Sequence, residues 1–186
     1  MEAVFLPSTV KSIGSWSFSG CRSLRLLVLP HRTDLDNVKE IIVQTAIYQI
    51  AKNAGVAYEY GNHRVNEWLI HHMDHAPFHK LCYNSSITTK HINDYINEHG
   101  NDSARAIHVI HGMTPLHMLS MNPHSPADAI AALLNVDMEV VFRLDNQGKI
   151  SLDYARDYNV GRLVALVNGL CNHRNAVAAT VSASIK

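Results

Sequence analysis

The segment WLIHHMDHAPFHKLC contains the residue types in this sequence that come closest to a reactive or metal-binding site. Imidazole and thiolate groups bind soft divalent metals such as zinc, and five such residues fall here: His71, His72, His75, His79 and Cys82. A single helix would bring His72, His75 and His79 to one face. Pro77, however, disfavours helical backbone at Ala76 and suits the start of a new helix. The spacing therefore favours surface or capping histidines without a metal, and a domain that responds to zinc or pH is the alternative.

Other arrangements that could catalyse a reaction are missing from the sequence. The motifs G-x-S-x-G, G-x-x-x-x-G-K and H-E-x-x-H do not occur. The neighbouring carboxylates Asp34 and Asp36 fit a helix cap. Among the thiols, Cys21 and Cys82 fit packed positions, whereas Cys171 is expected near the surface. We therefore expect a protein that is not an enzyme and that uses no cofactor.

The composition is that of a packed chain without a strong overall charge. The sequence has 186 residues, of which 47% are hydrophobic, and its 16 basic residues balance 16 acidic ones. Balanced charge gives no field to hold nucleic acid or an anionic membrane, so neither is an expected partner. Three distant cysteines do not form a disulfide pattern, and the first residues do not resemble a secretion signal. We expect an intracellular, cytoplasmic location.

The stretch GMTPLHML has the residue order of a helix start. A helix leaves its first N–H groups unpaired, so Thr114 suits the cap, and Pro115, which lacks an N–H, suits the first helical position. Leu116 is expected to face the core. A ring nitrogen of His117 is expected to reach backbone groups of the loop that leads in from a neighbouring unit. Gly112 permits the tight turn before the cap.

Two further segments repeat this helix start. Pro77 begins a degenerate copy, and Thr88 or Thr89 then caps a second helix that Gly100 ends. Residues 145–155 contain another copy, in which Ile150 and Ser151 replace the usual Thr and Pro and weaken the cap. The partner helices are expected at 126–135 and 160–168, and their inward residues are Ile130, Leu133 and Leu134 in the first and Leu163, Val164 and Val167 in the second.

The string TPLH and the tail DNQGKISLDYA resemble ankyrin repeats. The copies start 38 and 36 residues apart (115 − 77 and 151 − 115), near the ankyrin period of about 33 residues. The resemblance implies a mainly α fold in which about three ankyrin-like helix pairs form a solenoid over residues 76–172, followed by a C-terminal tail over 173–186. A helical bundle in which TPLH is a coincidence is the alternative.

The N-terminal segment contains a different repeat. Leu6-Pro7 recurs 23 residues later as Leu29-Pro30, with apolar, strand-like pieces at 10–13 and 24–29 between turn-forming glycines. The stretch LPSTVKSIGSWSFSGCRSLRLLVLP resembles a BspA-like leucine-rich repeat, with five residues at its core positions: Ile13, Gly14, Phe18, Cys21 and Leu24. The resemblance implies a short leucine-rich β segment over residues 1–33. A chance hairpin is the alternative.

Residues 34–75 are expected to link the two repeat systems. Apolar residues at four-residue spacing predict one helix from about 34 to 54, capped by Asp34 or Asp36 and ended by Gly55. A loop over 57–66 then leads to a second apolar segment at 68–70.

The ankyrin resemblance implies that the chain binds another protein through its loop tips. Such tips are held by rigid neighbours while their own side chains are free of packing. The expected partner-binding residues lie on two loops: His108, His111 and Met113 on the first, and Arg143, Asn146, Gln147 and Lys149 on the second. We therefore expect a non-catalytic protein-interaction module or scaffold. The sequence pattern does not identify the partner or the oligomeric state.

Overall fold

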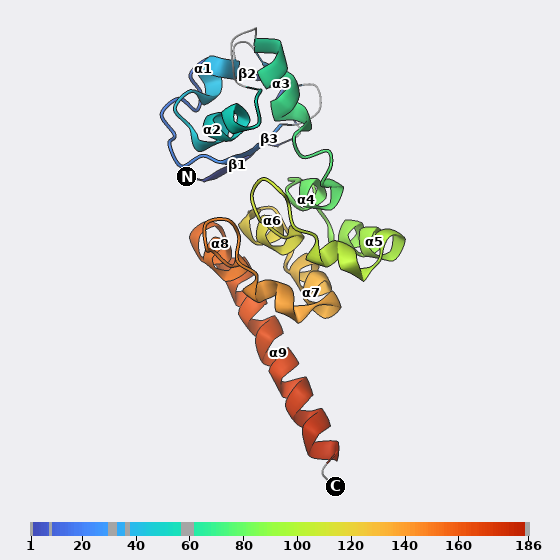
Figure 1. Cartoon of the computed structure of the whole chain (residues 1–186). Helices are drawn as coiled ribbons and strands as arrows, with labels where there is room; N and C mark the ends of the chain where they lie inside the picture. Colours follow the sequence, from blue (N-terminus) through green and yellow to red (C-terminus); the bar gives the residue numbers. More distant parts are fainter. Residues whose placement is uncertain (1, 8, 30–32, 36–37, 57–61, 185–186) are drawn as a thin grey trace. The chain divides into compact units, whose positions relative to one another are not determined.

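The computed structural model describes the chain except at residues 1, 8, 30–32, 36–37, 57–61 and 185–186. The described chain is mainly helical, which confirms the expected fold class at this level, and its short strands lie near the N-terminus (Figure 1). It divides into two compact units. Unit 1 contains residues 1–80 and 84–86, and unit 2 contains residues 81–83 and 87–186.

Unit 1 contains two pairs of parallel strands. Strand β1 (Ala3–Phe5) pairs with β3 (Leu26–Val28), and Ala3 lies opposite Leu26. Strand β2 (Ser12–Ile13) pairs with β4 (Asp34–Leu35), and Ser12 lies opposite Asp34. The paired residues are therefore 23 (26 − 3) and 22 (34 − 12) apart in sequence. The first offset equals the spacing of the two Leu-Pro pairs.

The same offset continues outside the strands. Backbone hydrogen bonds join Phe18 N to Ile41 O (3.1 Å), Gly20 N to Val43 O (3.2 Å) and Ile47 N to Leu24 O (2.8 Å). Each bond joins residues 23 apart (41 − 18, 43 − 20 and 47 − 24). The described parts of residues 24–47 thus lie beside the matching parts of residues 3–24, at an offset of 22 or 23 residues.

The prediction of a single linking helix over residues 34–54 is wrong. The segment contains β4, helix α1 (Val38–Ile42), a turn and helix α2 (Ala46–Asn53). Gln44 in the turn has a positive φ of 61°, and the Thr45 hydroxyl accepts a hydrogen bond from Tyr48 N at 3.1 Å. A left-handed residue followed by a side-chain cap ends one helix and starts another, so the apolar spacing continues across a break.

Helix α3 (Asn62–His71) completes unit 1 and replaces part of the loop expected over 57–66. It contacts α1, α2 and β3. The core between these elements is aliphatic and consists of Ile13, Leu27, Leu29, Ile41, Ile42, Ile47, Val65 and Leu69. Gly55, with φ +75°, follows α2 in the left-handed position expected for it.

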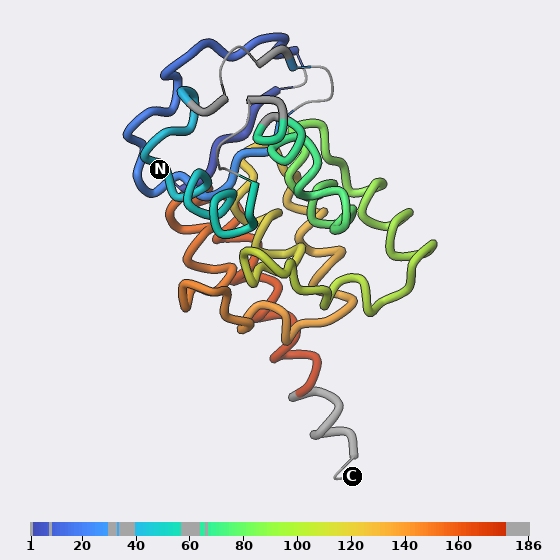
Figure 2. The backbone as a smooth tube through the Cα atoms, turned by 45° about the horizontal axis from the view of Figure 1, so that its top comes forward, coloured from blue at the N-terminus to red at the C-terminus, as the bar shows by residue number. Residues whose placement is uncertain are grey.

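Unit 2 is a succession of helices, coloured from green to red in Figure 2. Helix α4 (Pro77–Cys82) spans the division between the units. Unit 2 continues with α5 (Thr89–His99), η1 (Asn101–Arg105), α6 (Pro115–Met121), α7 (Ala127–Val136), η2 (Met138–Phe142), α8 (Ser151–Tyr158) and α9 (Val160–Ser184). Helix α6 packs on α8, while α5 and α9 both pack on α7. Helices α5, α6 and α7 thus each pack on the next α-helix but one in sequence. No helix in the described part of the chain is long and apolar enough to cross a bilayer.

The predicted ends of α5 and the predicted core face of α7 are confirmed. The Thr88 hydroxyl accepts a hydrogen bond from His91 N at 3.2 Å, and Gly100 ends α5 with φ +82°. Ile130, Leu133 and Leu134 of α7 are all buried.

Asparagines at helix ends connect alternate helices, α6 to the end of α4 and α8 to the end of α6. Asn122 follows α6 and donates through Nδ2 to the carbonyl of Cys82, the last residue of α4, at 3.0 Å. Asn159 follows α8 and donates through Nδ2 to the Pro123 carbonyl, just after α6, at 3.3 Å. The ends of α4, α6 and α8 are therefore joined by the same kind of bond.

Helix α9 differs from expectation in length and orientation. It continues to Ser184, so most of the expected tail over 173–186 is helical. Val164 and Val167 were expected to face inward but are 54% and 45% exposed, whereas Leu166 is fully buried. Apolar residues on two faces of one helix give the same spacing, and packing on α7 and α8 selects the face that contains Leu166.

Candidate partner-binding loops

The start of α6 is held by His117. The N–H of Thr114 donates to His117 Nδ1 at 3.1 Å, and the Thr114 hydroxyl lies 2.8 Å from the same nitrogen. Because Nδ1 accepts a backbone N–H, the ring proton is assigned to Nε2, which donates to the Lys149 carbonyl at 3.2 Å. The imidazole thus caps its own helix and binds the backbone of the next loop, as predicted.

Two consecutive loops are joined to each other. The first is closed by a hydrogen bond from His108 N to Met113 O at 2.8 Å, and the second by one from Asp145 N to Lys149 O at 2.9 Å. Between them, Asn146 N donates to the His111 carbonyl at 3.2 Å, and Asn146 Nδ2 donates to the carbonyl of Ile110 at 3.1 Å. Backbone bonds within and between the loops make the pair one braced surface.

Gly112 is required where the loops meet. Its φ is +68°, and a Cβ built on it would lie 2.7 Å from the backbone nitrogen of Asn146 and 2.3 Å from that residue's side-chain oxygen. The glycine therefore serves both the turn predicted from sequence and the close approach of the second loop.

Asp145 organises the second loop from inside. Its Oδ1 accepts the N–H groups of Gln147 (2.8 Å) and Lys149 (3.0 Å), and its Oδ2 accepts the hydroxyl of Tyr154 at 2.5 Å. The fully buried Tyr154 ring meets the His117 ring edge-on, with centroids 5.9 Å apart. The carboxylate is fully used in holding the turn, so its role is structural.

The seven expected partner-binding residues differ in how far their side chains are exposed. Arg143, Asn146 and Gln147 are exposed, and Lys149 is half-buried with its Nζ 5.3 Å from the centre of the Tyr154 ring. The expected exposure is wrong for the other three, since His108, His111 and Met113 are buried, and the two imidazole rings stack 5.0 Å apart. The first loop turns these side chains inward, a direction that the sequence does not reveal.

The sequence analysis did not identify four exposed apolar side chains that lie in or next to the two loops. Ile107 and Val109 are 57% and 82% exposed, and Phe142 and Leu144 are 61% and 64% exposed. Ile107 and Leu144 each directly precede the residue that closes a loop. Apolar residues at positions i and i+2 around a polar residue were the available signal, because an extended chain points both to one side.

The start of α8 is capped differently from that of α6. Asp153 occupies the position equivalent to His117, and its Oδ2 accepts the Ile150 N–H at 3.0 Å. Ser151 takes the place of Pro115; it is fully buried, and its hydroxyl has no hydrogen-bond partner in the described structure. The cap weakened by the loss of Thr and Pro is therefore restored by a carboxylate that the pattern did not indicate.

Replacing Ser151 with proline is expected to raise the free energy of unfolding of unit 2 by about 0.5–1 kcal/mol. The first N–H of a helix has no partner within the helix. Ile150 is extended, with φ −99° and ψ 168°, as a residue before proline should be. Urea unfolding followed by circular dichroism measures the change. Ser151→Ala removes the hydroxyl alone, so an equal gain from both variants would contradict a proline effect.

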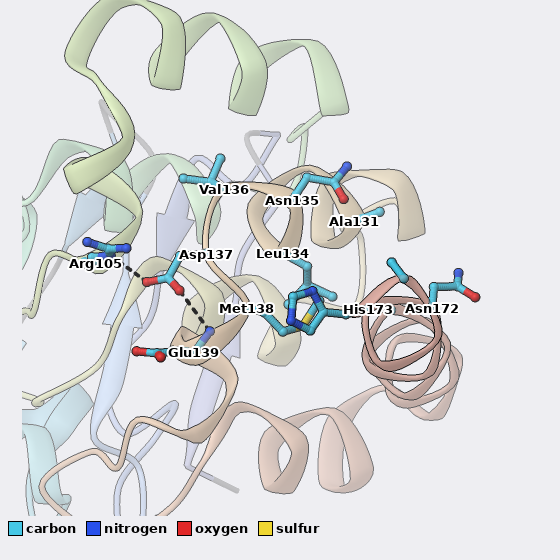
Figure 3. A pocket seen from close by; sticks show the side chains of 12 residues that line it. Arg105, Ala131, Leu134, Asn135, Val136, Asp137, Met138, Glu139, Asn172 and His173 are labelled. Atoms are coloured by element: carbon cyan, nitrogen blue, oxygen red, sulfur yellow. Dashed lines mark hydrogen bonds and ion pairs between the residues drawn. The ribbon is translucent and has the colours of Figure 1, made fainter. Parts of the chain in front are cut away.

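A solvent-open hollow of about 660 Å³ lies between α7, η2 and α9 (Figure 3). Its wall combines small and apolar residues such as Leu134, Met138 and Gly169 with the polar side chains of Asn172 and His173. Gly169 lets the two helices approach, because a Cβ there would lie 2.6 Å from the Leu134 side chain. Twelve residues line the hollow: Arg105, Ala131, Leu134, Asn135, Val136, Asp137, Met138, Glu139, Gly169, Asn172, His173 and Ala176.

One side of the hollow is fixed by an ion pair. Arg105 Nε lies 2.5 Å from Asp137 Oδ2, and Asp137 Oδ1 accepts the N–H of Glu139 at 2.9 Å (Figure 3). Burial is the largest single influence and would raise the pKa of Asp137, but the hydrogen bonds from Arg105 and the Glu139 N–H together with the nearby positive charges outweigh it, so the pKa is lowered. The carboxylate is therefore ionised and committed to the connection between η1 and η2.

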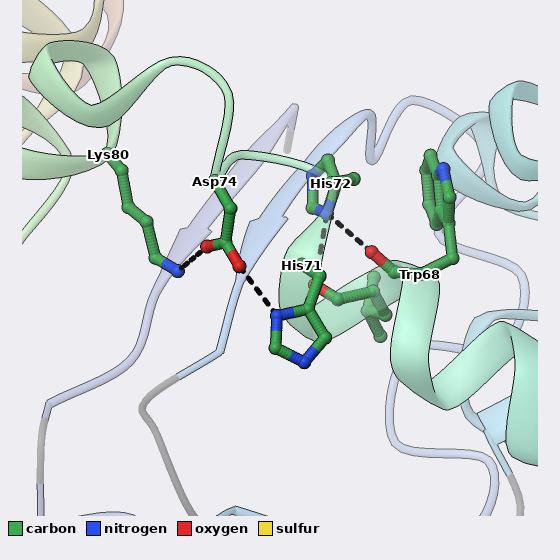
Figure 4. Close-up of polar contacts among 6 residues, drawn as sticks. Trp68, His71, His72, Asp74 and Lys80 are labelled. Atoms are coloured by element: carbon green, nitrogen blue, oxygen red, sulfur yellow. Dashed lines mark hydrogen bonds and ion pairs between the residues drawn. The ribbon is translucent and has the colours of Figure 1, made fainter.

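The histidine-rich segment uses its rings for local contacts (Figure 4). Asp74 binds the ammonium of Lys80 and lies 2.6 Å from His71 Nδ1, and these two groups lower the pKa of Asp74 to about 2. The buried His72 ring lies 3.0 Å from the Leu69 carbonyl and 3.2 Å from the Trp68 carbonyl through Nδ1, and it stacks on the Trp68 ring. Burial lowers the pKa of His72 to about 4, and the hydrogen bonds to the two carbonyls oppose this only in part.

The structure does not gather metal ligands in this segment. His79 and Cys82 are buried, and burial raises the pKa of the Cys82 thiol. Over the described residues, no group of three or more His, Cys, Asp or Glu side chains could hold a metal ion. Comparisons of the chain with family models, curated proteins and solved structures found no match.

Proposed function

We propose that this chain is a non-catalytic protein-interaction module, in which ankyrin-like helix pairs of unit 2 present two loops to a partner protein. Three features support the ankyrin-like assignment: the TPLH start of α6, the packing of α5, α6 and α7 each on the next α-helix but one, and the asparagine bonds between the ends of alternate helices. The 23-residue offset of the parallel strands supports a leucine-rich-repeat-like unit 1.

The exposed apolar side chains on the joined loops are the observation that supports this function most directly. Ile107, Val109, Phe142 and Leu144 are each more than half exposed, on segments fixed by backbone hydrogen bonds. Folding gains nothing from apolar side chains left in water, whereas a partner that covers them gains their burial. A braced loop also loses little conformational freedom when it binds.

The charge beside these side chains indicates the chemistry of the partner. Arg143 lies between Phe142 and Leu144 in sequence and is exposed. We infer a protein partner that presents apolar anchors with an acidic group beside them, since Arg is well suited to bind a carboxylate at an interface.

The experiment compares proteins captured by the full chain and by two double variants. Val109→Lys with Leu144→Lys alters the loops, and Val160→Lys with Val164→Lys places the same charges at exposed valines of α9. A partner is expected that binds the wild type and the α9 variant but loses at least about tenfold in affinity for the loop variant. Equal binding of every captured protein by the loop variant would refute the assignment, provided that circular dichroism shows the variant folded.

A further inference from the structure

The two joined loops of unit 2 contain the same glycine turn. Gly112 in the first loop and Gly148 in the second have φ of +68° and +72°, and each lies two residues before the cap of a helix. Each turn is closed by a backbone hydrogen bond, over 108–113 in the first loop and over 145–149 in the second. The first loop therefore shows what a turn of this kind binds.

In the first loop, an asparagine of the chain itself occupies the space at the glycine. A Cβ on Gly112 would lie 2.3 Å from Asn146 Oδ1, so the amide rests directly on the turn. The same asparagine donates to the two carbonyls that precede the glycine. Its N–H bonds the His111 carbonyl at 3.2 Å, and its Nδ2 bonds the Ile110 carbonyl at 3.1 Å. Two acceptors and a missing side chain thus make a seat for one asparagine.

The same seat in the second loop is open. No atom lies within 4 Å of an ideal Cβ on Gly148. Counted back from the glycine, the equivalent carbonyls belong to Gln147 and Asn146, and no residue in the described part of the chain donates a hydrogen bond to either of them. All three residues are exposed. The second loop therefore has the acceptors and the space, but no asparagine in them.

We propose that the second loop binds an asparagine of the partner protein in the way that the first loop binds Asn146. This rests on the proposed function and names the group that the partner presents. The partner's asparagine donates its N–H to the Gln147 carbonyl and its side-chain amide to the Asn146 carbonyl, and it packs on Gly148. An ionised aspartate has no side-chain donor and would place oxygen against oxygen, so the seat selects the amide.

This seat is continuous with the exposed apolar side chains of the proposed surface. Leu144 directly precedes the second loop, and Phe142 lies two residues before it. Hydrogen bonds to exposed carbonyls replace bonds to water, so each adds only modestly to affinity. We expect the burial of Phe142 and Leu144 to give most of the affinity, while the asparagine fixes the orientation of the partner.

A peptide copied from the second loop tests the seat before any partner is known. The probe is a head-to-tail cyclic peptide of residues 143–150, which contains the asparagine that the first loop binds. It is added to the isotopically labelled full chain and followed by NMR. We expect a Kd on the order of millimolar, with shifts of the Gln147 and Gly148 amide signals, because their peptide units contain the two acceptor carbonyls.

The same peptide with Asn146→Asp is the control probe. It should bind at least about threefold more weakly, because it lacks the amide donor. Two results overturn the proposal: no shift of the Gln147 and Gly148 signals up to about 10 mM peptide, or equal binding of the two peptides.

A substitution in the protein closes the same seat. Asparagine tolerates left-handed backbone better than most residues, so Gly148→Asn should fold, while its side chain fills the open space and weakens peptide binding at least about tenfold. Gly100→Asn is the matched control, since Gly100 also has a positive φ, +82°, and an open Cβ position but ends α5. It should bind the peptide like the wild type. Unchanged binding by Gly148→Asn, or an equal loss in both variants, contradicts the seat.

The captured partner separates this proposal from the proposed function. A partner that is lost by Val109→Lys with Leu144→Lys should also bind Gly148→Asn at least about tenfold more weakly. If Gly148→Asn binds that partner normally, the asparagine seat is refuted and the proposed function stands. If the peptide binds through its asparagine while the loop variant retains every captured protein, the seat is supported and the apolar loop surface is refuted.

Discussion

Replacing Gly112 with alanine is expected to lower the free energy of unfolding of unit 2 by about 2–5 kcal/mol. A non-glycine residue in the left-handed region costs about 1–2 kcal/mol. The new Cβ would lie 2.7 Å from Asn146 N, so the second loop must move and the bond from Asn146 N to the His111 carbonyl must stretch. Forcing an extra carbon into a packed site costs a further 1–3 kcal/mol or so. Urea unfolding followed by circular dichroism measures the change.

Gly148→Ala is the matched control for this substitution. Gly148 has almost the same backbone angle, φ +72°, but no atom lies within 4 Å of its ideal Cβ. Its replacement should lower the free energy of unfolding only by the cost of a non-glycine residue at positive φ, about 1–2 kcal/mol. If the two variants were destabilised equally, the close approach of the loops at Gly112 would be wrong. The Gly112 variant should also bind the proposed partner more weakly, because its loops are no longer joined.

Lowering the pH is expected to destabilise unit 1 through His72 by about 3 kcal/mol. The pKa of His72 is about 4 in the folded chain and 6.5 in an ordinary environment, a difference of about 2.5. The unfolded chain therefore binds a proton at a higher pH than the folded chain does. The contribution of His72 to the free energy of unfolding is fully present above pH 6.5 and is lost as the pH falls from 6.5 to 4. Below pH 4 this residue causes no further change.

His72→Asn isolates this effect, because its amide nitrogen can replace Nδ1–H toward the Leu69 and Trp68 carbonyls. Both tryptophans, Trp16 and Trp68, belong to unit 1, so tryptophan fluorescence follows its urea unfolding at each pH. The variant should lose the slope between pH 6.5 and 4 that His72 contributes.

His75→Asn is the control for His72→Asn. His75 belongs to the same unit, so the same tryptophan signal reports on it, but its side chain is exposed. Water solvates the exposed ring in the folded and unfolded chain alike. An unchanged slope in His72→Asn, or the same change in both variants, would contradict the burial of His72 as the cause.

The helix starts of unit 2 could be predicted from sequence because each depends on neighbouring residues. Thr114, Pro115 and His117 act within four residues of one another, and the predicted contact of His117 with the neighbouring loop is present. Thr88 and Gly100 likewise mark the ends of α5 by local chemistry. Caps are readable because the groups that they satisfy lie within one turn of the chain.

The sequence was less informative about the direction in which side chains point and about contacts between residues far apart in the chain. A helix across residues 34–54 was predicted from apolar spacing, but the backbone turns at Gln44, a residue type that does not signal a left-handed conformation. Val164 and Leu166 both belong to apolar sets on α9, and only the position of α7 and α8 decides which set is covered. The buried His108 and the exposed Val109 are adjacent residues, whose directions depend on how the loop closes.

The parallel pairing in unit 1 constrains how its length can change during evolution. Ala3 pairs with Leu26, Leu24 with Ile47, and Phe18 with Ile41, always 23 residues apart. Deleting a single residue between two such contacts would shift every later partner by one position and turn buried aliphatic side chains toward water. Adding or removing a block of about 23 residues would leave each remaining contact intact. Relatives of this chain should therefore differ by whole blocks of that length in this region, with shorter insertions confined to turns outside the paired segments.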